Sequence, residues 1–309
     1  MYDDFFNKTR TKLSFLLYPL ASEEQTKAFL HYTEVKYKTD QTLPFNEHRA
    51  EYEAYSFELL KRLTRPQMEK ISADYTTYKR QQASKIGAAR FLEEQIMPRL
   101  KRFTRQNILG YHGLEHTELV ALRAIDVALS LGREQPSELV PVMLAAAIHD
   151  CARTDDGFNT HHGKEAADMP EVKQFLADPI FNLTPAQQKQ IRYAAYNHTT
   201  AQPYDGVSYD YIAQSLCDGD RIRLSWERGH SPKFFFTAKG DELGSMNPYR
   251  VLQYLKDWDN LLQNNRIRPL CGKLAGKYHI GYTSKTSPKR ALFVDPDYRS
   301  PQNTPHYRR

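Results

Sequence analysis

The chain has 309 residues, of which 40% are hydrophobic and 26% charged, a balance typical of a globular protein rather than a disordered one. No apolar run approaches the roughly 18 residues of a transmembrane helix, so we expect no membrane partner. Three cysteines are too few for a disulfide scaffold, and their odd number favours a reducing compartment such as the cytoplasm. The net charge of +6 is compatible with an acidic partner such as a nucleotide or a nucleic acid.

Residues 1–95 are expected to form a helical N-terminal region. Apolar residues recur at helical spacing among many charges in residues 49–63 and 84–96. The tyrosines of this region fit either aromatic packing between helices or a surface that binds a partner. They are Tyr32, Tyr37, Tyr52, Tyr55, Tyr75 and Tyr78.

Residues 96–265 carry the strongest helix signals. Gly132 ends an amphipathic segment, Ser137 can cap the next helix, and residues 143–148 are apolar enough to be buried. Thr184 opens a capping box. Residues 233–239 contain three consecutive phenylalanines and fit a short strand or an ordered loop. Helices are therefore expected at residues 115–131, 137–149, 184–198, 209–224 and 247–263.

Residues 266–309 form a basic tail rich in Pro, Tyr and Ser, for which we expect loops or partial disorder. Basic residues alternate with tyrosines there, which fits contact with nucleic acid as well as a solvated extension. The whole pattern predicts an all-α protein with a helical N-terminal region, a helical bundle and a loop-rich C-terminal tail.

Histidines are concentrated in the predicted bundle, where six of the eleven lie between residues 112 and 198. His149 and Asp150 follow the most apolar helix, where an imidazole and a carboxylate cost free energy unless they are paired or bind a metal. A metal ion held by these two residues with His116 and Asp220 would offset that cost. This mixed nitrogen and oxygen set suits Mn, Fe, Co, Ni or Zn, and the sequence does not separate these ions from Mg.

The order of these residues resembles that of the HD-domain superfamily of metal-dependent phosphohydrolases. In that family a histidine, a His-Asp doublet and a distant aspartate lie on the helices of one bundle. His116 precedes Thr-Glu-Leu-Val at a helix start, His149 and Asp150 form the doublet, and Asp220 precedes Arg-Ile much as the family's aspartate precedes Arg-Leu. The similarity covers about residues 108–225 and implies a divalent metal ion at these four ligands.

The aspartate position has a competitor, because Asp218 lies two residues before Asp220. We favour Asp220 as the ligand and expect Asp218 to form a hydrogen bond to a ligand. Some HD proteins bind a second ion through two further histidines, for which His198 and either His161 or His162 are the candidates. We favour His162, which stands before two alanines as the family's histidine stands before small residues, so the resemblance implies one or two ions.

Basic residues near these motifs are candidates for binding phosphate. Arg153 stands three residues after Asp150, where many HD proteins have a lysine, and its guanidinium can hold a phosphate through two parallel hydrogen bonds. The alternative for Arg153 is an ion pair with Asp155 or Asp156. Further candidates for binding substrate are Lys164 and Arg221.

His112 is a candidate proton donor. The Tyr-His-x-x-x-His segment at residues 111–116 looks like that of the cyclic nucleotide phosphodiesterases, in which the first histidine donates the proton and the second binds metal. His112 would then protonate the leaving alkoxide, with Asp150 and Arg153 as the other catalytic residues. Gly113 departs from that pattern, which usually has asparagine, and the alternative for His112 is packing at a helix start.

Together these motifs predict an enzyme that hydrolyses a phosphate ester or anhydride, such as one in a nucleotide or related small molecule, with water activated by metal. A first alternative is an HD-type di-iron oxygenase resembling myo-inositol oxygenase, because such enzymes have the same order of ligands. A second is a regulatory module that binds a nucleotide or nucleic acid with little turnover, through the N-terminal region and the basic tail.

Overall fold

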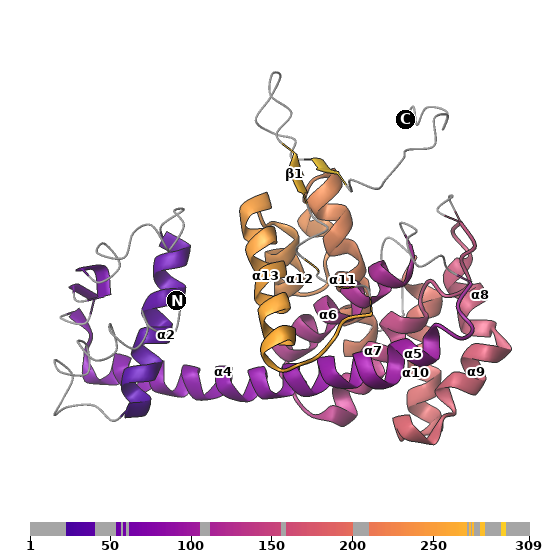
Figure 1. The fold of residues 1–309 in the computed structure, drawn as a ribbon, viewed down its shortest axis with the longest axis horizontal. Helices are drawn as coiled ribbons and strands as arrows, with labels where there is room; N and C mark the ends of the chain where they lie inside the picture. Colours follow the sequence, from indigo (N-terminus) through magenta and orange to yellow (C-terminus); the bar gives the residue numbers. More distant parts are fainter. Residues whose placement is uncertain are drawn as a thin grey trace. The chain divides into compact units, whose positions relative to one another are not determined.

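The computed structural model describes residues 23–40, 54–56, 58–59, 62–105, 112–155, 159–199, 210–270, 272, 274, 279–281 and 292–294. Helices account for most of these residues (Figure 1), which confirms the predicted all-α fold. Among the described helices, none has the length and apolar character needed to cross a bilayer.

The predicted tail contains a short antiparallel pair of strands that the sequence did not indicate. These strands are β1 (His279–Gly281) and β2 (Leu292–Val294), and Ile280 pairs with Phe293. Apart from residues 266–270, 272, 274 and these strands, the tail lies outside the described residues. Its contact with nucleic acid therefore stays a prediction.

The chain divides into two compact units, Met1–Ala83 and Ser84–Arg309, and the division falls within the long helix α4 (Arg65–Phe91). Sequence patterning marks the change only at residue 96, where the helix signals strengthen. The second unit begins earlier because Ala88 and Ala89, in the last turns of α4, already belong to its hydrophobic core.

In the first unit, aromatic rings join α2 (Glu23–Asp40) to the early turns of α4. His31 stacks on Tyr78 with ring centroids 4.0 Å apart, and its ring centroid lies 5.4 Å from that of Tyr75. Lys79 Nζ lies 2.6 Å from Glu24 Oε2 between the same helices. Tyr75 and Tyr78 thus take part in packing between helices, and a partner-binding role for the other tyrosines stays a prediction.

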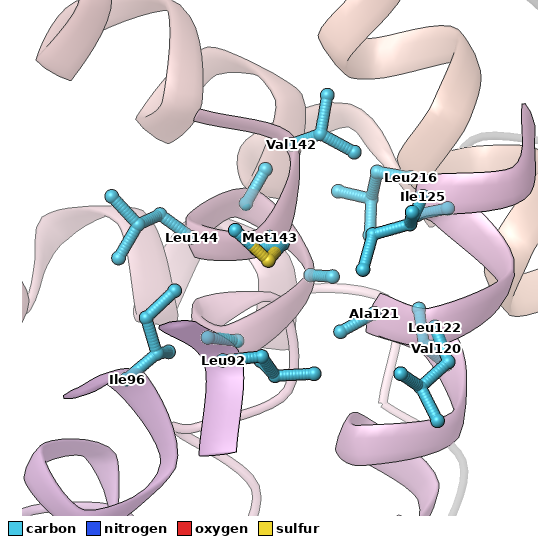
Figure 2. Close-up of a cluster of buried hydrophobic side chains, with 14 of the residues drawn as sticks. Leu92, Ile96, Val120, Ala121, Leu122, Ile125, Val142, Met143, Leu144 and Leu216 are labelled. Carbon is cyan, nitrogen blue, oxygen red and sulfur yellow. The ribbon is translucent and has the colours of Figure 1, made fainter. Parts of the chain in front are cut away.

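The second unit is a bundle centred on four helices. α6 packs against α7 and α11, and α10 packs against α7, α8 and α11. Leu92 and Ile96 contribute to the same core from η2, the π-helical turn that directly follows α4 (Figure 2). After α4 the elements are η2 (Leu92–Ile96), α5 (Met97–Leu100), α6 (Leu114–Ser130), α7 (Pro136–Ile148), α8 (His162–Asp168), α9 (Pro170–Leu176), η3 (Pro179–Phe181), α10 (Pro185–Asn197), α11 (Tyr211–Arg228), η4 (Pro232–Phe234), α12 (Ala238–Gly244) and α13 (Pro248–Asn264).

Local sequence explains where two of these helices begin. The predicted capping box of α10 is present, since Thr184 Oγ1 accepts from Gln187 N–H at 3.2 Å and Gln187 Oε1 accepts from Thr184 N–H at 2.9 Å. The predicted cap of α7 at Ser137 is wrong. Gln135 caps α7 instead, because Pro136 has the fixed φ of a first helical position and Glu138 Oε2 accepts from the Gln135 N–H at 3.2 Å.

Residues 233–239 form an ordered loop rather than a strand. The 3₁₀ turn η4 is followed by an extended stretch that leads into α12, whose N-cap is Thr237. The Asp218 carboxylate accepts hydrogen bonds from the backbone N–H groups of Phe236 and Thr237, at 2.8 and 2.9 Å. Because these donors are satisfied by a side chain, the stretch needs no partner strand.

A buried pair of carboxyl groups joins η2, α6 and the chain after α13. The Leu270 N–H donates to Glu93 Oε2 at 3.0 Å and to Glu118 Oε1 at 2.8 Å. Burial, and then the neighbouring Glu118 charge, raises the pKa of Glu93 to about 10. Glu93 is therefore protonated in the folded chain at neutral pH.

Glu93→Gln is expected to make the folded state more stable at pH 8 and to change it little at pH 4.5. Below a pH of about 4.5, Glu93 is protonated in both the folded and the unfolded state. As the pH rises from there toward about 10, the unfolded chain binds fewer protons than the folded one. Each pH unit then lowers the wild-type free energy of unfolding by up to about 1.4 kcal/mol.

The measurement is urea unfolding of both proteins at the two pH values. Glu94→Gln is the matched control, because Glu94 is exposed and its Oε1 accepts from Arg90 Nη1 at 3.2 Å. A stability gain for Glu93→Gln that is equal at both pH values would show that Glu93 titrates normally.

Candidate metal centre

Histidine and aspartate side chains in or next to five helices meet inside the second unit. His116 lies in the first turn of α6, and His149 and Asp150 follow α7 directly, because the apolar residues that end α7 take them into the core. His162 begins α8, and His198 follows α10. These side chains are buried, whereas Asp220, in the middle of α11, is 20% exposed and His112, just before α6, is 23% exposed.

Asp150 occupies the middle of the cluster, and its Oδ2 faces one group of histidines. Oδ2 lies 3.0 Å from His112 Nδ1, 3.2 Å from His149 Nε2 and 3.7 Å from His116 Nε2. Asp220 completes this side, with Oδ1 at 3.0 Å from His116 Nε2 and 3.9 Å from His149 Nε2. The four predicted ligands of the first ion thus lie together around one point.

The second oxygen of Asp150 faces a different group. Oδ1 lies 2.9 Å from His162 Nε2, 3.7 Å from His198 Nε2 and 3.1 Å from Arg153 Nε. The two histidine Nε2 atoms are 2.8 Å apart. The residues predicted for a second ion therefore meet on the other side of the same carboxylate.

Three of these histidines are oriented by the backbone. His149, His162 and His198 each donate from Nδ1 to the carbonyl oxygen three residues earlier, at 2.6 Å for His149 and His198. This bond puts a proton on Nδ1 and turns Nε2 toward Asp150. Histidines that bind metals in proteins are held in the same way.

The cluster contains buried nitrogen atoms without hydrogen bonds. Among the described residues, three such atoms have no hydrogen-bond partner, namely both ring nitrogens of His116 and the Nε2 of His149. Leaving such atoms unpaired costs about 1–3 kcal/mol each, and a bound cation would remove that cost for the Nε2 atoms. These atoms belong to groups of ligand atoms within 4.8 Å of one another, so buried His and Asp side chains here could hold a metal ion.

Charge and burial compete at each of these groups. Burial lowers the pKa of His116 to about 4, so this ring is neutral, as a ligand must be. Burial alone would raise the pKa of Asp150, but the His149 charge and the hydrogen bond with His112 hold it well below its usual range. At His149 the Asp150 charge outweighs burial and raises the pKa to about 9.

The geometry separates the alternatives that the sequence left open. His162 is buried against Asp150, whereas His161 is exposed and its backbone N–H donates to Asn159 Oδ1 at 2.7 Å. Asp220 faces His116, whereas Asp218 accepts three hydrogen bonds from Phe236 and Thr237. Asp218 thus binds the loop before α12, and the prediction that it forms a hydrogen bond to a ligand is wrong.

The three candidate phosphate-binding residues lie in different places. Arg153 is at the cluster, through its ion pair with Asp150. Arg221 instead donates from Nη1 to Phe234 O at 2.8 Å and lies over the Phe236 ring. The Lys164 side chain is exposed on α8. Only Arg153 is therefore held against the centre by a contact among the described residues.

Sequence reasoning missed Gly163, which lets α8 approach α10. A Cβ at this position would overlap with Ala195 O and would lie 2.9 Å from His198 Cε1 and Nδ1. Only glycine therefore allows His162 and His198 to face each other at this distance. The signal was a glycine inside a predicted metal motif, directly after one of its histidines.

Comparison with protein families, curated proteins and solved structures gives no match to this chain. The resemblance to the HD-domain superfamily therefore rests on the motif residues alone.

Proposed function

We propose that this protein is a metal-dependent phosphohydrolase that acts on a phosphate ester or anhydride in a nucleotide or a related small molecule. One observation carries the proposal, namely that the two oxygens of Asp150 face two different groups of histidines. His116 and His149, with Asp220, would hold one ion, and His162 and His198 would hold the other. Two neighbouring ions with a shared ligand are typical of enzymes that cleave phosphate esters.

When bound, the metal would lower the pKa of a water molecule and polarise a phosphoryl oxygen. Arg153 would bind the phosphate and offset its charge, with the guanidinium held in place by Nε donating to Asp150 Oδ1 at 3.1 Å. His112 would donate the proton to the leaving oxygen. Its contact with Asp150, 3.0 Å from Nδ1 to Oδ2, would orient the ring.

The direct test is a panel of phosphate esters and anhydrides, including nucleotides, assayed with Mn, Co, Ni, Mg, Zn or Fe added singly. We expect turnover with at least one pair of substrate and metal, and none with Asp150→Ala. Turnover no higher than that of Asp150→Ala in every combination would end the proposal. Two iron ions per chain with oxygen consumption would favour the di-iron oxygenase instead.

His112→Ala is expected to keep the metal and the fold but to lower the turnover number about 10²–10⁴-fold, the usual loss for a general acid. His112 is partly exposed at the edge of the cluster and is not needed to complete either group of ligands. His161→Ala, at an exposed neighbouring histidine, should leave turnover unchanged. If His112→Ala loses metal in elemental analysis, His112 is a ligand and not the proton donor.

A further inference from the structure

Four consecutive residues of α11 contact different parts of the protein. A helix turns about 100° per residue, so Asp218 and Arg221 lie about 60° apart on one face while Asp220 points nearly opposite to Asp218. Asp220 Oδ1 lies 3.0 Å from His116 Nε2. Gly219 points toward α6, where a Cβ would lie 2.9 Å from Val120 O. The rotation of α11 about its axis therefore determines whether Asp220 reaches His116.

The face of α11 that carries Asp218 and Arg221 is held by residues 234–240, which we call the strap. Asp218 is fully buried and accepts three hydrogen bonds, from Phe236 N–H at 2.8 Å, Thr237 N–H at 2.9 Å and Thr237 Oγ1 at 2.6 Å. Arg221 Nη1 donates to Phe234 O at 2.8 Å, and its guanidinium lies 5.1 Å from the centroid of the Phe236 ring.

Thr237 is the central residue of the strap. Its hydroxyl donates to Asp218 Oδ2 and accepts from the Gly240 N–H at 2.9 Å, so one buried side chain caps α12 and binds α11. Gly240 also lies against Asp218, since a Cβ at this glycine would lie 2.8 Å from Asp218 Cβ. The strap therefore fits the Asp218 face of α11 closely, while α6 contacts the neighbouring face at Gly219.

Small rotations of α11 would matter because side-chain atoms lie about 5–6 Å from a helix axis. A rotation of about 20° then moves the Asp220 carboxylate by about 2 Å. Metal–ligand distances tolerate only about ±0.2 Å. Without the strap, α11 would keep its packing against α6, α7 and α10 and the bond from Trp226 Nε1 to Leu243 O, but the buried Asp218 carboxylate would lose its three hydrogen bonds.

We infer that the strap positions Asp220 for metal binding, and that Thr237 is the positioning residue through its hydrogen bond to Asp218. This inference rests on the metal centre of the proposed function. The hydrogen bonds of the strap go to Asp218 and Arg221, so it acts by setting the rotation of α11. Thr237 lies outside the metal-binding motif that the sequence predicts.

The test is titration of the full chain with Co²⁺, followed by its visible absorption and by calorimetry. Thr237→Val keeps the shape of the side chain and removes both hydrogen bonds of the hydroxyl, and we expect it to weaken Co²⁺ binding about 10–100-fold. Thr237→Ser keeps the hydroxyl and should bind Co²⁺ as the wild type does. Arg221→Met, which removes the bond to Phe234 O, should weaken binding in the same direction by a smaller factor.

Asn247→Ala is the matched control for a lost helix cap. Asn247 Oδ1 accepts from Arg250 N–H at 3.0 Å at the start of α13, which carries none of the proposed ligands. This variant should lose thermal stability comparably to Thr237→Val but bind Co²⁺ normally.

The outcomes separate the two proposals. If the wild type binds Co²⁺ and Thr237→Val and Arg221→Met bind it equally well, the strap has no positioning role and the metal centre stands. If Asn247→Ala weakens binding as much as Thr237→Val, the effect is a general loss of stability and the inference is wrong. If the wild type itself binds no divalent metal, the proposed function and this inference both fail.

Discussion

Asp150→Ala is expected to abolish metal binding and to lower the free energy of unfolding by about 3–5 kcal/mol even without added metal. Asp150 supplies one oxygen to each group of histidines, so the substitution removes an oxygen ligand from both groups. Its removal also leaves the charge on Arg153, whose side chain is 9% exposed, without this partner. Breaking a buried ion pair from one side typically costs this much.

The measurement combines elemental analysis after desalting with urea unfolding. Asp168→Ala is the matched control, because Asp168 is exposed at the end of α8 and its ion pair with Arg192 is long, at 3.5 Å. The control should keep its metal and change stability by less than about 1 kcal/mol. If Asp150→Ala keeps a full complement of metal, Asp150 is not the shared ligand.

Gly163→Ala is expected to lower the free energy of unfolding by about 1–3 kcal/mol and to weaken metal binding on the His162 side. The added methyl group would collide with the backbone of Ala195 and with the ring of His198, so α8 must move away from α10. His162 would move with α8, and the 2.8 Å approach of the two Nε2 atoms would be lost.

Gly87→Ala is the matched control for this glycine. Gly87 also lies in a helix, and a Cβ there would meet no atom within 4 Å. The control should be neutral or more stable by up to about 1 kcal/mol, because alanine favours helix more than glycine does. Equal metal affinity in Gly163→Ala and Gly87→Ala, measured by titration with Mn²⁺, would contradict the importance of this close approach.

Much of the bundle could be predicted because its helices carry local signals. Residues 143–148 are apolar, and Thr184 with Gln187 forms a capping box, so α7 and α10 followed from sequence. Short helices such as α8 and α12 escaped prediction, because seven residues carry too little periodicity to be recognised. The strand pair at residues 279–281 and 292–294 escaped because strands of three residues are too short to show an alternating pattern.

The cluster could be predicted as a set of residues but not as a geometry. Spacing alone shows that Asp218 and Asp220 lie on nearly opposite faces of a helix, but not which face points to His116. That depends on the contact of Gly219 with α6 and of Thr237 with Asp218, which join segments far apart in the chain. The same holds for His161 and His162, which differ only in which of them the start of α8 turns inward.

The most direct test of the metal centre is anomalous diffraction from crystals grown with Mn²⁺ or Co²⁺, recorded at the absorption edge of each metal. We expect one or two strong peaks inside the cluster, about 2.0–2.3 Å from the Nε2 atoms of His116 and His149, with Asp150 and Asp220 as oxygen ligands. Crystals with excess metal that show no peak there, or peaks only at exposed histidines such as His161, would contradict the assignment.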